Sequence, residues 1–95
     1  MIVSGSASQA LAAALAAETG LPLAATSYGR FPDGEGLVTI DGALAGERAV
    51  VVAATVSDAA HVELLQLQDA AREAGAEEVV TVLPYMGYAR QDEAF

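Results

Sequence analysis

The chain has 95 residues, of which 54% are hydrophobic and 18% charged, a composition typical of one small globular domain. It has 13 acidic residues against four arginines and no lysine, and its formal net charge of −9 disfavours binding to nucleic acid or to anionic membranes. The chain has no cysteine, which excludes both a disulfide framework and a cysteine-ligated metal site.

The acidic balance, together with abundant alanine and valine, is typical of proteins from a high-salt cytoplasm, where salt screens the repulsion between like charges. An acidic protein from ordinary salinity is the alternative. No apolar run approaches the ~18 residues of a membrane span, and no basic region precedes the apolar start of the chain. We therefore expect a cytoplasmic protein without a signal peptide, and the acidic balance favours a halophilic origin.

The start of the chain predicts a strand followed by a helix. Residues 2–4 form a short apolar strand, and an alanine-rich helix follows, with Gly20 just beyond its last turn. Ser6 and Gln9 have the spacing of a capping box at the start of this helix. The turn over residues 5–8 invites comparison with a phosphate-binding loop, but it holds one glycine where a dinucleotide fingerprint has three. We interpret it as a structural turn.

Four segments complete the strand pattern. Residues 21–28 and 37–40 read as strands joined by a short connection, which favours antiparallel neighbours. The continuous apolar run over residues 49–53 is typical of a strand buried on both faces. Residues 78–83 form the last strand, because Pro84 cannot donate a hydrogen bond to a sheet.

A second, longer helix precedes this last strand. Ser57 or Asp58 caps it, and Gly75 ends it. Four residues recur at helical spacing and form its buried stripe: Leu64, Leu67, Ala71 and Ala74. The order β-α-β-β-β-α-β predicts an α/β fold over residues 1–95, with a mainly parallel sheet and flanking helices.

Two residues in or just before this helix are candidates for a catalytic or binding role. His61 is the only histidine, but no serine or cysteine nucleophile is placed by sequence to use it, so we interpret it as a surface or packing residue. Thr55 follows a strand end, where it either leads into the helix or contacts a phosphate.

Two polar clusters each follow a predicted strand, and both suit recognition of a purine base. Phe31 and Arg90 offer a ring and a guanidinium plane that can stack on a base. Asp33 or Glu35 can accept a hydrogen bond from an exocyclic amino group, and Gln91 offers both donors and an acceptor. The alternative is that both clusters are ordinary solvated turns.

These clusters carry a family resemblance. F-P-D-G-E at 31–35 and P-Y-x-x-Y-A-R-Q-D at 84–92 resemble the two adenine-site motifs of ribose-phosphate pyrophosphokinase, the synthetase of phosphoribosyl pyrophosphate. The resemblance implies a phosphoribosyltransferase-like (Rossmann-like) half-domain. It also implies that, with Mg²⁺, the β,γ-diphosphoryl group of ATP is transferred to ribose 5-phosphate, which gives AMP and phosphoribosyl pyrophosphate.

The resemblance further implies a homo-oligomer whose active site lies at a subunit interface. One subunit would line the adenine pocket with Phe31, Asp33 and Glu35. The neighbouring subunit would line it with a second group of residues: Arg90, Gln91 and Asp92.

The sequence also departs from the family pattern. The family's metal-binding histidine and aspartate, its catalytic loop and its ribose-phosphate loop are absent, and without lysine the chain is poor in the cations that phosphoryl transfer requires. We therefore expect no catalytic residue and no metal site in this segment, which we interpret as the amino-terminal fragment of the enzyme, inactive alone. A non-catalytic assembly or regulatory module of the same fold is the alternative.

Overall fold

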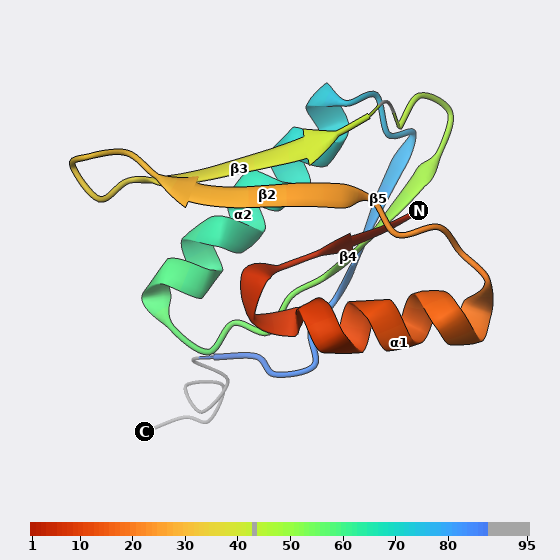
Figure 1. Ribbon diagram of the computed structural model, residues 1–95, viewed down its shortest axis with the longest axis horizontal. Helices are drawn as coiled ribbons and strands as arrows, with labels where there is room; N and C mark the ends of the chain where they lie inside the picture. The colour runs from red at the N-terminus through yellow and green to blue at the C-terminus, as the bar shows by residue number, and fades with distance from the viewer. Residues whose placement is uncertain (43, 88–95) are drawn as a thin grey trace, which may run out of the picture.

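Three parallel strands form the centre of the computed structural model, which describes residues 1–42 and 44–87. They are β1 (Ile2–Ser4), β4 (Arg48–Val52) and β5 (Glu78–Val82), in the spatial order β1-β4-β5 (Figure 1). Strand β4 lies between two neighbours, and its Ala49 and Val51 are fully buried. The predicted buried strand and parallel sheet are therefore confirmed.

One helix covers each face of this sheet. Alternate residues of a strand point to opposite faces, so apolar side chains of the sheet pack against both helices. Helix α1 (Gln9–Thr19) follows a short 3₁₀ turn, η1 (Ser6–Ser8), and packs Ala12 against β1 and β4. Helix α2 (Asp58–Glu73) packs on the opposite face through the predicted stripe, in which Leu67 and Ala71 are fully buried. Among the described residues no helix is long and apolar enough to cross a membrane.

The remaining strands form a separate antiparallel hairpin. Strand β2 (Ala25–Arg30) pairs with β3 (Gly36–Asp41), and Figure 1 shows the connecting loop projecting away from the parallel sheet. The exposure of β3 alternates along the strand, and Val38 and Ile40 pack toward the core beside α2. The predicted antiparallel pair is confirmed, and one face of the hairpin faces solvent.

The predicted capping box is wrong. The Gln9 side chain donates to the Ser6 carbonyl over 3.0 Å, and the Ser6 hydroxyl donates to Glu63 instead of capping a helix. By contrast, the Ser57 hydroxyl accepts from the Ala60 N–H over 3.1 Å and caps α2 as predicted. At Ser6, a hydrogen bond to the Glu63 carboxylate of the distant helix α2 therefore takes the place of a local cap.

The strand predicted at 21–28 begins later, at Ala25. The Pro22 carbonyl accepts from the Ile2 N–H and the Ala24 N–H donates to the Ile2 carbonyl, both over 2.8 Å. This segment therefore borders β1 before it enters the hairpin.

Candidate functional site

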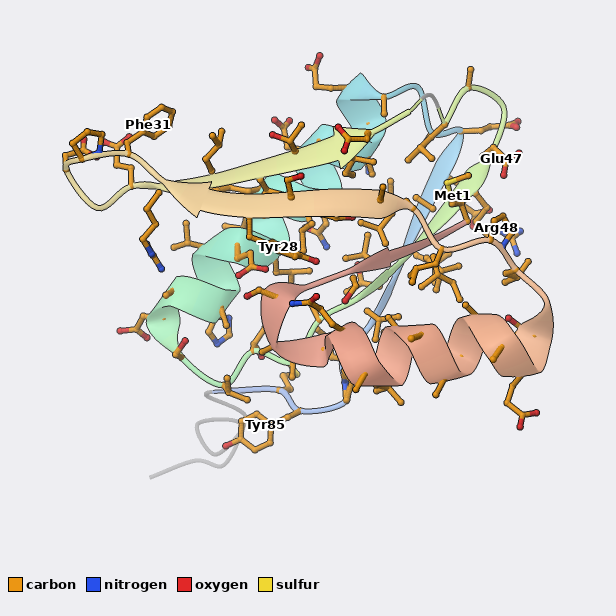
Figure 2. All side chains as sticks on the ribbon, viewed as in Figure 1. Met1, Tyr28, Phe31, Glu47, Arg48 and Tyr85 are labelled. Atoms are coloured by element: carbon orange, nitrogen blue, oxygen red, sulfur yellow. The ribbon has the colours of Figure 1, made fainter. Side chains whose placement is uncertain are left out.

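The first predicted motif forms the exposed tip of the β2–β3 hairpin. Residues 31–35 connect the final strand pair, Arg30 with Gly36, and all five are exposed. Phe31 stands at the far end of the hairpin with 49% of its surface exposed (Figure 2). The structure thus brings Phe31, Asp33 and Glu35 together in one short loop, as the sequence predicted.

Hydrogen bonds give this loop a defined shape. The Phe31 N–H donates to the Glu35 carbonyl over 2.8 Å, and the Gly34 N–H donates to the Phe31 carbonyl over 2.9 Å. The Glu35 N–H donates to Asp33 Oδ1 over 3.0 Å, so one oxygen of Asp33 already shapes the turn. Gly34 adopts φ +94°, a left-handed conformation that favours glycine, which explains the glycine of the motif.

Below the tip, a cleft of about 510 Å³ separates the hairpin from the first half of α2. Its charged and amide side chains include Arg30, Glu35, Glu63 and Gln66. The complete lining consists of these four residues together with Ser6, Tyr28, Gly29, Gly34, Gly36, Leu37, Val38, Ala59 and Val62. The tip residues Gly34 and Glu35 therefore border a mixed polar and apolar hollow.

Two residues that line this cleft, Tyr28 and Glu63, make polar contacts with the end of β1 and the turn after it. The Tyr28 hydroxyl donates to the Ser4 carbonyl at the end of β1, and burial raises the pKa of Tyr28 above its ordinary value of 10.0. Glu63 accepts from the Ser6 N–H over 2.6 Å and from the Ser6 hydroxyl over 2.7 Å. The carboxylate of Glu63 thus binds the turn after β1. This contact supports the interpretation of that turn as structural rather than as a phosphate-binding loop.

The second motif begins in a loop that Thr55 holds. Thr55 is 1% exposed, and both its N–H (2.9 Å) and its hydroxyl (3.1 Å) donate to the Tyr85 carbonyl. The Gly87 N–H donates back to the Thr55 hydroxyl over 2.8 Å. His61 lies beside the same glycine, since a Cβ at Gly87 would come within 2.9 Å of His61 Nε2. Thr55 therefore anchors this loop, and His61 is a packing residue.

The other predicted site residues, Arg90, Gln91 and Asp92, lie outside the described residues. Tyr85 marks where their motif starts, and Figure 2 shows it well separated from Phe31. Sequence reasoning missed the supporting residues Tyr28 and Glu63. Alternation along β2 could have placed Tyr28 on the inner face of the hairpin, but no local signal pairs Glu63 with a serine 57 positions away.

Comparisons with known proteins show the family of this chain. The family model described as the N-terminal domain of ribose phosphate pyrophosphokinase matches residues 1–95. The ribose-phosphate pyrophosphokinase of Halobacterium salinarum is 66% identical over 95 residues, which are 100% of this chain and 34% of that protein. The corresponding protein of Methanosarcina acetivorans is 43% identical over 94 residues, which are 99% of this chain and 32% of that protein.

Solved structures show the same fold. The phosphoribosylpyrophosphate synthetase of Mycobacterium smegmatis superposes with a TM-score of 0.82 at 27% identity, covering 98% of this chain and 32% of that one. A purine phosphoribosyltransferase from Pyrococcus horikoshii shares the fold, with a TM-score of 0.67 at 18% identity over 93% of this chain and 65% of that one. The chain spans about a third of the length of the curated relatives it matches.

Proposed function

Because the chain belongs to the ribose phosphate pyrophosphokinase family, as its N-terminal domain, we propose that it recognises the adenine of ATP in that enzyme. The whole enzyme would transfer diphosphate from ATP to ribose 5-phosphate and release AMP. This domain would contribute base recognition, and the residues that carry the chemistry would lie elsewhere.

The observation that carries the proposal is the ordered, exposed tip of the β2–β3 hairpin. An aromatic ring that is half exposed on a loop closed by hydrogen bonds is ready to stack on a flat base. Preorganisation reduces the conformational entropy that is lost on binding. The side chain of Glu35, on the same loop and at the cleft, can accept a hydrogen bond from the exocyclic amino group of adenine.

The separation of the two motifs supports a site shared between copies of the chain. Phe31 lies at the hairpin tip, whereas Tyr85 lies just beyond the carboxyl end of β5, and Figure 2 shows the two well apart. A pocket that uses both motifs would therefore take Phe31, Asp33 and Glu35 from one copy. It would take Arg90, Gln91 and Asp92 from a neighbouring copy in a homo-oligomer.

Magnesium would have to be held outside this part of the chain. Within residues 1–42 and 44–87 no group of three histidine, cysteine, aspartate or glutamate side chains is placed to hold a metal ion. The described residues therefore do not fit a metal site, and we assign them no step that depends on Mg²⁺. Their proposed role is limited to holding and orienting the base.

Phe31→Ala in an active whole enzyme tests the proposal. A suitable host is the Halobacterium salinarum relative with its matched 95 residues replaced by this chain, since the two are 66% identical there. Loss of a stacking surface worth ~1–3 kcal/mol should weaken ATP about 5- to 150-fold. The affinity for ribose 5-phosphate should hardly change, because its site is expected elsewhere.

Leu11→Ala is a matched control, because Leu11 is a large apolar residue on α1 with a similar exposure of 41%. It should leave both substrate affinities unchanged. If the pocket is shared, mixing Phe31→Ala subunits with Arg90→Ala subunits should restore some intact sites. Unchanged ATP affinity in a folded Phe31→Ala enzyme would leave a non-catalytic assembly or regulatory module as the better interpretation.

A further inference from the structure

Arg30 makes a contact that the sequence motif does not explain. It is the last residue of β2, and its Nη1 donates to the Gly34 carbonyl over 2.7 Å, across the mouth of the tip loop. Its guanidinium thus joins the strand to the far side of the turn. A cation that donates to a carbonyl forms a stronger hydrogen bond than a neutral donor does.

Apolar packing does not hold the tip loop in its shape. Residues 31–35 are all exposed, so hydrogen bonds rather than apolar burial define the shape of the loop. Three of those bonds form within the loop itself, and the Arg30 bond is made by a side chain outside it. Exposed segments with few apolar contacts open most readily, so the loss of one bond should have a measurable effect here.

We propose that Arg30 is a positioning residue for base recognition, whose guanidinium holds the tip loop in the shape that presents Phe31 and Glu35. The inference rests on the proposed adenine-binding function of the tip. It goes further by assigning a role to a residue outside the F-P-D-G-E motif. Arg30 is not a catalytic residue in this proposal, because it acts through the loop and not on the base.

A different role for the same cation is attraction of the ATP phosphates, since Arg30 also borders the cleft. The two roles predict different preferences among nucleoside triphosphates. A phosphate-attracting arginine strengthens the binding of every nucleoside triphosphate equally. A residue that orients Phe31 and Glu35 strengthens the binding of ATP more than that of GTP, because the two differ only in the base.

The test compares Arg30→Ala and Arg30→Lys in the same active chimera. We expect Arg30→Ala to raise the KM for ATP about 2- to 10-fold, the range for loss of one exposed hydrogen bond, with little change in kcat. The preference for ATP over GTP in kcat/KM should fall by a similar factor. Arg30→Lys, which can still donate to the Gly34 carbonyl, should recover at least half of the loss.

A second measurement does not depend on activity. In the 95-residue chain, Arg30→Ala should speed the amide hydrogen exchange of Phe31, Gly34 and Glu35 and leave that of Val51 unchanged. Unaltered exchange at the tip would overturn the positioning role. Equal losses for ATP and GTP would overturn it in favour of phosphate attraction.

The Phe31→Ala result separates the two proposals. If Phe31→Ala weakens ATP and Arg30→Ala does not, the positioning role of Arg30 is wrong and base recognition stands. If neither substitution affects ATP, the proposed function of the tip is wrong, and the Arg30 proposal is overturned with it.

Discussion

Replacing Gly87 with alanine should detach the loop that leads into the second motif. An added Cβ would overlap the Thr55 carbonyl oxygen and lie 2.9 Å from His61 Nε2. Carbon and oxygen atoms in ordinary contact are about 3.3–3.6 Å apart, so the loop must move to relieve the overlap. That movement would disturb the hydrogen bonds of 2.8–3.1 Å that join Thr55 to Tyr85 and Gly87.

The size of the effect follows from those contacts. Each hydrogen bond contributes about 0.5–1.5 kcal/mol net, and loss of the three gives about 1.5–4.5 kcal/mol. The cost should approach the upper value because Thr55 is buried and its polar groups would lose their partners. Urea denaturation measures this change in the free energy of unfolding, and amide exchange at Thr55 reports the loop locally.

Gly29→Ala is the matched control, because nothing lies within 4 Å of a Cβ at that position in β2. It should change the free energy of unfolding by less than ~0.5 kcal/mol. If the two variants unfold at the same urea concentration and Thr55 stays equally protected, the inferred crowding around Gly87 is wrong.

The remaining predictions concern pH and salt. Tyr28→Phe should lower the free energy of unfolding by about 0.5–1.5 kcal/mol at pH 7, because the Ser4 carbonyl loses its donor. Burial raises the pKa of Tyr28, so its stabilising contribution is complete below pH 10.0, its ordinary pKa, and is lost as the pH rises through the raised pKa. Urea titrations should therefore show a steeper alkaline loss for the parent than for Tyr28→Phe, and equal slopes would contradict this. With a net charge of −9, the chain should gain about 1 kcal/mol, or ~4–8 °C in Tm, between dilute buffer and molar KCl, and a flat response would argue against a halophilic origin.

Much of the fold could be predicted because it depends on local patterns. The apolar run around Val51 is typical of a strand buried on both faces, and it forms the central strand of the parallel sheet. The spacing of Leu67 and Ala71 identified the buried face of α2, and its predicted start at Ser57 or Asp58 includes the observed cap, Ser57. Each of these signals lies within one element, and the tertiary structure agrees with each of them.

The wrong and missing predictions involve contacts between distant segments. The Ser6 hydroxyl has two possible partners, a local amide and the distant Glu63, and only the fold decides between them. No local pattern marks Gly87, although the lack of space beside Thr55 excludes a side chain there. The tip motif was found because all its residues lie in one loop, whereas Arg90 lies outside the described residues and its role stays a prediction.

The first three turns of α2 support both motifs. Gln66 donates to the Gly36 carbonyl beside the tip loop over 2.9 Å, Glu63 holds the turn after β1, and His61 lies against Gly87. One rigid helical segment therefore contacts three elements that are far apart in the sequence. Substitutions in this segment should disturb the hairpin and the second-motif loop together, whereas a change at Phe31 affects the hairpin tip alone. Helix α2 thus contacts both the hairpin and the described part of the second motif, and Figure 2 shows Phe31 and Tyr85 well separated.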